Sequence, residues 1–164
     1  MSRRSLVLAG VALTPLLLLA LAVGAARLSH RPVEVGLVDG RLRPCPPSPN
    51  CICSEEGGSE SSISPLGFGC APKAAFLSLV EFLEAEPNAT IIDVRDGYVH
   101  AVYRTRFLGF ADDVEFRLDA EARAVHVRSA SRIGYSDLGA NRARIDDLRR
   151  RWKPPAEGRE EGAG

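Results

Sequence analysis

The chain lacks the features that mark nucleic-acid-binding proteins, metalloproteins and the common enzyme classes. Its 164 residues carry 21 basic and 21 acidic side chains, so no basic excess is available to displace counterions from phosphates, and we expect no nucleic-acid partner. The three histidines are scattered and no Cys-x2-Cys pair occurs, so we expect no metal site. The sequence has no nucleophile elbow, phosphate-binding loop or paired-carboxylate signature, and it implies no cofactor.

Charge is also missing from residues 5–26, which are predominantly apolar. As a helix this run would extend about 33 Å, enough to cross a hydrocarbon core of about 30 Å. Arg3 and Arg4 should stay in the cytoplasm, which leaves the rest of the chain outside. We therefore predict a single-pass protein of the inner membrane, with its globular domain on the periplasmic side and residues 5–26 as its contact with the membrane.

Three interpretations of this N-terminal segment, residues 1–26, remain open. A signal anchor is favoured because the apolar run exceeds the roughly 7–15 residues of a signal-peptide core. A cleaved signal is the second, since Val23-Gly24-Ala25 offers small residues to a peptidase. The sequence SRRSLV also resembles a twin-arginine signal, although the leucine-rich core and the missing lysine count against it. All three export the C-terminal domain.

Export governs the interpretation of the cysteines. An even number of cysteines outside the cytoplasm favours disulfides over metal ligation, and the four are Cys45, Cys51, Cys53 and Cys70. They lie in a stretch rich in proline, glycine and serine, which predicts irregular chain pinned by bridges.

The rest of the sequence predicts an α+β fold. Residues 27–44 are expected to be a linker, with an edge strand around residues 33–37, and residues 45–152 a globular domain. Helical spacing of apolar residues predicts one helix over 72–87 and another from about Leu138 to Trp152. Alternation predicts strands at 90–94, 98–107, 112–120 and 124–131. We expect an antiparallel sheet of four or five strands with two helices on its apolar face, and a disordered tail over 153–164.

The second face of this sheet is unusually polar. It is expected to carry His100, Arg104, Arg106, Asp113, Glu115, Arg117, His126, Arg128 and Arg132. One interpretation is a solvated face with cross-strand ion pairs, in which Arg104 and Arg106 lie near Asp113 and Glu115. The other is a face that binds an anion through clustered guanidinium groups. The first is favoured.

The last helix carries an asparagine on its apolar side. Leu138, Asn141, Ile145, Leu148 and Trp152 share one stripe, so Asn141 should point toward the sheet. Ser129 and Ser131 have the strand phase of the buried valines and should face it, while Asp137 suits the helix N-cap.

Two interpretations of this cluster compete, and a third is weaker. The cluster is either a sealed hydrogen-bonded clasp, which the residues favour, or an anion site at the helix N-terminus surrounded by Arg132, Arg142 and Arg144. A hydrolase using Ser129 or Ser131 is weaker, because His126 has the opposite strand phase.

These segments resemble one known family. The sequences CPPSPNCICS, DDVEFRLD and VRSASRIGYSDLGANRARIDDLR are similar to the motifs of the domain-of-unknown-function 1499 family, over about residues 45–152. The resemblance implies a Cys45–Cys51 bridge, with Cys53–Cys70 as an additional one. The family offers no activity to carry over.

The functional expectation is an uncharacterised extracytoplasmic envelope domain that binds a small polar or anionic ligand, or an envelope protein, without catalysis. The alternatives are a purely structural or interaction protein and a hydrolase. The ligand-binding candidates are Arg128, Ser129, Ser131, Arg132, Asp137, Asn141, Arg142 and Arg144.

Overall fold

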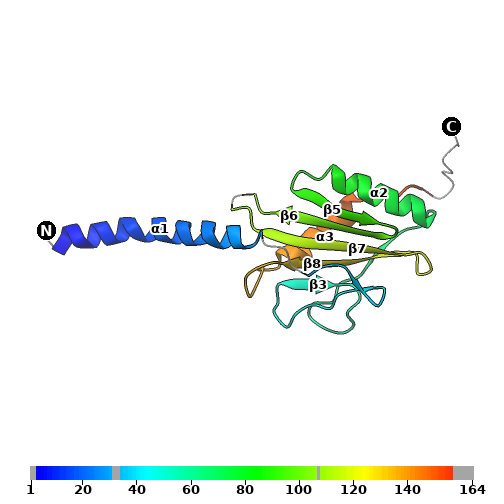
Figure 1. Ribbon diagram of the computed structural model, residues 1–164, viewed down its shortest axis with the longest axis horizontal. Coiled ribbons are helices and arrows are strands. Elements are labelled where there is room, and N and C mark those ends of the chain that lie inside the picture. Colours follow the sequence, from blue (N-terminus) through cyan, green and yellow to red (C-terminus); the bar gives the residue numbers. More distant parts are fainter. Residues whose placement is uncertain (1–2, 31–33, 107, 157–164) are drawn as a thin grey trace.

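The four strands predicted from alternation form the greater part of one antiparallel sheet. The computed structural model describes residues 3–30, 34–106 and 108–156, with side chains from residue 14 onward (Figure 1). The four strands are β5 (Ala89–Arg95), β6 (Tyr98–Arg104), β7 (Ala111–Asp119) and β8 (Ala124–Ser131). They pair in chain order, with β5 at one edge of the sheet. The expected meander is confirmed.

Two short strands from the cysteine-rich stretch enlarge the sheet beyond the expected four or five strands. β3 (Cys51–Cys53) and β4 (Leu66–Gly67) both pair with β8, which makes a six-stranded sheet of order β3-β8-β7-β6-β5 with β4 beside β8. A separate hairpin joins β1 (Leu37–Val38) to β2 (Arg41–Leu42). The prediction of irregular chain was wrong for these two segments because they form hydrogen bonds with β8 and so become strands. Local composition does not encode such long-range pairing.

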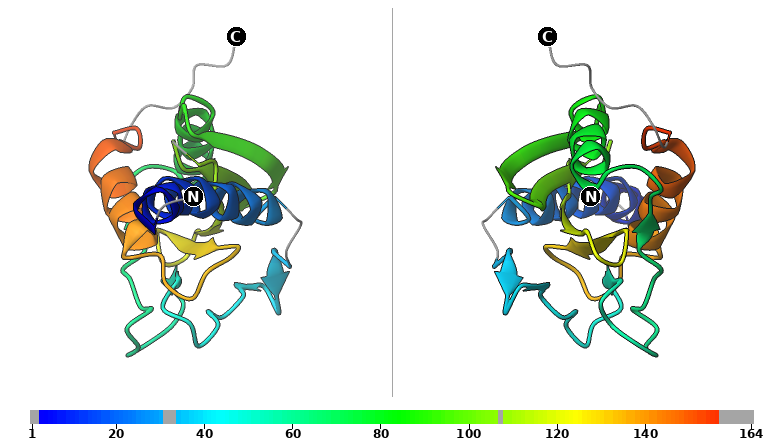
Figure 2. Two further views of the ribbon diagram at one scale, coloured as in Figure 1. Left: turned by 90° about the vertical axis from the view of Figure 1, so that its left-hand side faces the viewer. Right: turned by 90° about the vertical axis from the view of Figure 1, so that its right-hand side faces the viewer.

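Both predicted helices pack on one sheet face. α2 (Pro72–Glu84) and α3 (Ala140–Arg151) cover the apolar core, while the β1–β2 hairpin lies on the other side of the sheet from α3 (Figure 2). The core side chains alternate along the strands as expected and include Val99, Ala101, Val114, Phe116, Val125, Val127, Leu79, Leu83, Ile145 and Leu148. Phe107, at the end of the predicted strand 98–107, lies outside the described residues.

α3 begins later than expected, and Leu138 does not belong to its buried stripe. Leu138 and Gly139 have positive φ angles of 54° and 83°, which turn the chain just before the helix. The Leu138 side chain is therefore 96% exposed, whereas Asn141, Ile145 and Leu148 are buried.

The apolar N-terminal segment forms α1 (Arg3–Leu28), which projects from one end of the domain (Figure 1). No helix within the described part of the chain is both long and apolar enough to cross a membrane, so the predicted transmembrane helix is not found there. The base of α1 is tied to the domain: the Ser29 hydroxyl donates to the Ala26 carbonyl at 2.6 Å and accepts from the Ala111 amide at 2.9 Å.

The predicted linker is also part of the fold. Residues 34–45, which we call the strap, lie over the polar face of the sheet, where Leu42 and Cys45 pack against Cys53 and Tyr98. Carboxylates of Glu115 on β7 and of Glu55 and Glu56, just after β3, accept the strap backbone N–H groups, a long-range interaction that the local sequence does not display. The residues of the expected disordered tail after Ala156 lie outside the described chain.

One of the two expected disulfides is present. Cys45 and Cys51 are bonded, as the family resemblance implies, whereas Cys53 and Cys70 are free, buried thiols. Their predicted bridge was wrong because the two thiols occupy different cores: Cys70 packs with the helices, and Cys53 packs under the strap.

Removing the Cys45–Cys51 bridge by serine substitution of both cysteines should lower the free energy of unfolding by about 2 kcal/mol, since the bridge closes a short loop. Urea unfolding without reductant measures this loss.

In the wild type, burial raises the pKa of Cys53, so iodoacetamide should label neither Cys53 nor Cys70 until the protein unfolds. Labelling of the native protein would contradict the buried-thiol assignment.

Candidate functional site

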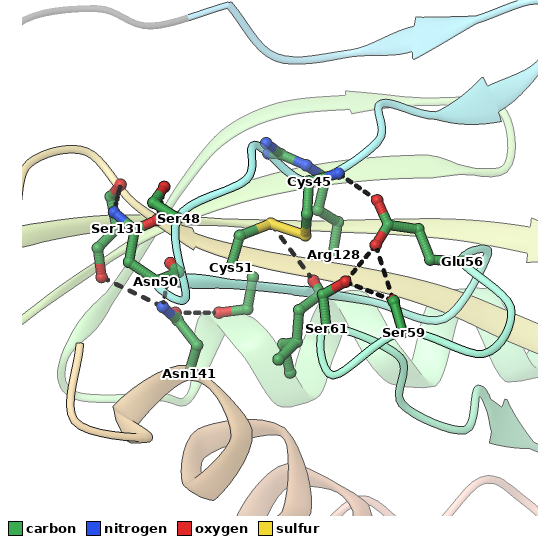
Figure 3. Close-up of a disulfide and its surroundings, with 12 residues drawn as sticks. Cys45, Ser48, Asn50, Cys51, Glu56, Ser59, Ser61, Arg128, Ser131 and Asn141 are labelled. Atoms are coloured by element: carbon green, nitrogen blue, oxygen red, sulfur yellow. Dashed lines mark hydrogen bonds between the residues drawn. A yellow bond between two sulfur atoms is a disulfide. The ribbon is translucent and has the colours of Figure 1, made fainter. Parts of the chain in front are cut away.

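Asn141 is the centre of a hydrogen-bonded cluster that we call the polar clasp: Asn50, Ser129, Ser131, Asn141 and Arg144. The Asn141 amide oxygen accepts from the Ser129 hydroxyl at 2.6 Å and from Arg144 at 2.6 Å. Its amide nitrogen donates to the Asn50 carbonyl at 2.9 Å and to the Ser131 hydroxyl at 3.1 Å (Figure 3). Asn141 and Ser129 are fully buried. The expected inward orientation of the two serines and Asn141 is therefore present, and the cluster is sealed.

Asn50 is a member of this clasp whose role the sequence interpretation missed. Its side-chain amide donates to the Gly134 carbonyl at 2.6 Å, and its oxygen accepts from the Ser48 hydroxyl at 2.7 Å. The next residue, Cys51, is held by the disulfide and by β3. The loop 46–50 is thus fastened to both β8 and α3. The signal in the sequence that could have indicated a role for Asn50 is its position next to Cys51, within the motif CPPSPNCICS.

Arg144 joins the clasp to β7. Its guanidinium donates to Ser129 at 3.0 Å and to Asp112, and lies over the Tyr103 ring at 5.1 Å from the centroid. The Ser129 hydroxyl therefore donates to the Asn141 amide oxygen and accepts from the Arg144 guanidinium. His126 lies on the other sheet face, where its Nδ1 is 3.1 Å from the Ser54 hydroxyl oxygen. Within the described residues, Ser129 has no histidine partner that would activate it as a nucleophile.

Asp137 caps α3 as its residue type predicted, although Gly139 occupies the N-cap position. One carboxylate oxygen accepts from the Gly139 amide at 3.0 Å and the other from the Asn141 amide at 2.7 Å. These are the amides that would otherwise receive a bound anion. The Asp137 carboxylate thus occupies the position at the helix N-terminus that a bound anion would take.

Arg128 and Arg132 lie apart from the clasp, on the polar sheet face. With His100, Asp113 and Glu115 they form a group that we call the charged layer, in which all but the half-buried Arg132 are buried. Asp113 accepts from His100 Nε2 at 2.7 Å and from Arg132 Nη2 at 2.7 Å and Nε at 2.8 Å. Glu115 accepts from Arg128 at 2.9 Å. The candidate residues therefore divide between two faces rather than converging on one anion site.

The strap covers the charged layer, so the expectation of a solvated face was wrong. Three glutamates accept strap backbone N–H groups: Glu115 from Gly36 at 2.6 Å, Glu55 from Leu42 at 2.5 Å, and Glu56 from Cys45. Glu55 also pairs with Arg117 at 2.5 Å. Arg104 and Arg106, expected to pair with Asp113 and Glu115, are exposed instead. The reason is that Arg128 and Arg132 pair with these two carboxylates instead.

Asp113 should make the stability of the protein depend on acid pH. Burial by itself raises the pKa of Asp113, but hydrogen bonds from His100 and Arg132 outweigh it and hold the pKa below the ordinary value of 3.8. A lowered folded pKa contributes stability above the unfolded pKa, and this is lost as the pH falls through the folded value. The free energy of unfolding in urea should therefore fall more between about pH 5 and pH 3 in the wild type than in Asp113→Asn. Equal slopes would contradict the assignment.

An open pocket of about 540 Å³ lies beside the sealed clasp. It is lined by residues 46–49, Cys51, Ile52, Ser59, Glu60, Ser61, residues 136–139 and Arg142. Arg142 donates to the carbonyls of Glu60 at 2.8 Å and Ser62 at 2.9 Å, which fixes the loop 59–62 against α3. Of the candidate residues, Asp137 and Arg142 line this pocket. The described residues hold no group of three or more His, Cys, Asp or Glu side chains that could bind a metal ion.

Fold and site together define an α+β domain in which the central polar residues are sealed in hydrogen bonds beside a separate, open pocket. A family model described as "Protein of unknown function (DUF1499)" matches residues 41–151, which is 111 of the 164 residues. The chain belongs to this family, as its motifs indicated. No curated protein and no solved structure matches the chain.

Proposed function

We propose that the chain is an extracytoplasmic domain of the cell envelope, held at the inner membrane through residues 5–26, which binds a small polar ligand or a segment of a partner without catalysing a reaction. The location is supported by the uncharged N-terminal run and by the disulfide, a bond that persists in oxidising compartments.

The pocket is the observation that carries the binding proposal. Its proline-rich wall is fixed by the disulfide and by the clasp, and the opposite wall is fixed by Arg142. A concave site with preformed walls requires little ordering on binding, which favours affinity. Serine hydroxyls at the pocket and the backbone of residues 136–139 supply polar groups to orient a ligand.

The charges at the pocket favour a neutral polar ligand over an anionic one. Asp137 and Glu60 place two carboxylates in the lining, and the Arg142 guanidinium is engaged by carbonyl groups. An anion would lose hydration and gain repulsion from the carboxylates.

Native mass spectrometry of the protein purified from its own envelope tests this proposal. Ser136→Trp fills the pocket at an exposed position, and Ser64→Trp is a matched control at an exposed serine outside the pocket lining. We expect a bound small molecule or peptide on the wild type and on Ser64→Trp, and its loss from Ser136→Trp. An adduct of the same mass on all three proteins would refute binding in the pocket and place the ligand elsewhere on the domain. No adduct on any of them would refute ligand binding and leave the purely structural interpretation.

A further inference from the structure

The loop between β8 and α3 holds two large apolar side chains in water. Leu138 is 96% exposed and Tyr135 is 77% exposed. The Leu138 backbone is in the left-handed region, which is unfavourable for leucine. Hydrogen bonds keep it there: the Leu138 amide donates to the Ser136 hydroxyl at 3.2 Å, and the Gly139 amide to Asp137 at 3.0 Å. The exposure of Leu138 is thus built into the backbone of the loop.

This loop lies at the end of the domain from which α1 leaves. Arg132, at the start of the loop, donates to the carbonyl of Ser29 at 3.3 Å, immediately after α1. The β6–β7 turn reaches the same place, since His30 lies 3.0 Å from the Gly109 carbonyl. Figure 1 shows the loop, the turn and the base of α1 together at one end of the sheet. The turn adds Leu108, which is 38% exposed, and the exposed side chain of Arg106.

α1 indicates what this end of the domain faces. Its leucines at positions 16, 17, 18, 19 and 21 are all more than half exposed. Successive positions point around the whole helix, so residues 16–21 of α1 are apolar on all sides rather than along one stripe. A groove in a partner protein would match a single stripe, whereas lipid matches a helix that is apolar all round. Tyrosine and arginine near such a helix suit the interface between lipid chains and anionic headgroups.

We infer that the α1 end of the domain docks on a lipid surface, with Tyr135, Leu138 and Leu108 entering the interface and Arg106 facing anionic headgroups. This inference rests on the proposed attachment of residues 5–26 to the membrane. Leu138 also lines the pocket, so docking would place one edge of the pocket beside the headgroups.

Tryptophan depth measurement on the full chain tests the docking. Leu138→Trp and Tyr135→Trp are reconstituted in vesicles of phosphatidylcholine and phosphatidylglycerol whose acyl chains carry bromine, a quencher of tryptophan. Ala122→Trp is the matched control, because Ala122 is exposed in the β7–β8 turn at the opposite end of the sheet. The native tryptophan, Trp152, is buried and gives the background measured in the wild type. Circular dichroism confirms that each variant folds.

We expect the emission of Leu138→Trp and Tyr135→Trp to shift to shorter wavelength and to lose intensity in brominated vesicles, while Ala122→Trp keeps the wild-type signal. If the protein floats with the vesicles but neither loop tryptophan is quenched more than Ala122→Trp, the docking is refuted and the attachment through residues 5–26 stands. If the full chain does not float with the vesicles, both are refuted.

Discussion

Replacement of Glu115 by alanine is expected to lower the free energy of unfolding by about 3–5 kcal/mol, the range for breaking a buried ion pair on one side. Glu115 is fully buried. It accepts from Arg128 at 2.9 Å, from the Tyr98 hydroxyl at 2.8 Å and from the Gly36 amide at 2.6 Å. Its removal leaves the Arg128 cation buried, with a guanidinium Nε that already has no hydrogen-bond partner among the described residues. Urea unfolding at neutral pH measures the loss.

The double variant Glu115→Leu/Arg128→Met should be more stable than Glu115→Ala alone, because it removes both charges and leaves no uncompensated ion. Glu84→Ala, at an exposed glutamate on α2, is the matched control and should change the stability by less than about 0.5 kcal/mol. The prediction fails if Glu115→Ala behaves like Glu84→Ala, since the charged layer would then contribute little to the fold.

Replacement of Asn141 by leucine is expected to lower the free energy of unfolding by about 2–4 kcal/mol. The leucine has a similar size but offers no hydrogen-bonding atoms, so the buried Ser129 hydroxyl loses its acceptor and Arg144 loses one of its acceptors. Each buried polar group left without a partner costs about 1–3 kcal/mol. The clasp also fixes the loop 46–50, so hydrogen exchange in that loop should quicken in the variant.

Arg142→Ala is the matched control for Asn141→Leu because it is the next residue on the same helix. Arg142 donates to two loop carbonyls at the surface, and its loss should cost only about 0.5–1.5 kcal/mol. Urea unfolding of the two variants side by side separates a sealed clasp from a surface contact. An Asn141→Leu protein as stable as Arg142→Ala would show that the clasp does not hold α3 to the sheet.

Local sequence patterns predicted the strands and helices well where the conformation of a residue depends mainly on its neighbours in the sequence. Alternation placed Val125, Val127 and Ser129 on the same face of β8, and the structure has all three inward. Helical spacing likewise turned Asn141 and Ile145 toward the core. The same patterns failed at Leu138, since two residues with positive φ interrupt the helical phase before α3 begins. Helical spacing of apolar residues predicts burial only where the backbone is regular, and the backbone at Leu138 and Gly139 is not.

At the candidate site too, the local roles of residues were predicted from the sequence and their long-range contacts were not. The carboxylate of Asp137 and the inward serines were predicted as residue types with a local role, and they have it. Strand phase predicted the polar sheet face for Arg128 and Arg132, although Arg132 was also expected around the helix N-terminus, and it did not predict the partners of either arginine. Which carboxylate each arginine meets depends on the register between β7 and β8, set by pairing of residues far apart in the chain.

The sequence alone determined the meander of four strands, the two helices, the Cys45–Cys51 bridge through family resemblance, and the inward-facing Asn141, because period and residue type are local properties. Only the tertiary structure decided that the strap covers the charged layer, that Cys53 and Cys70 lie in different cores, and that the clasp is sealed while a pocket stays open beside it. Each of these depends on contacts between segments distant in sequence, since burial of a charge or a thiol is decided by whatever chain packs over it.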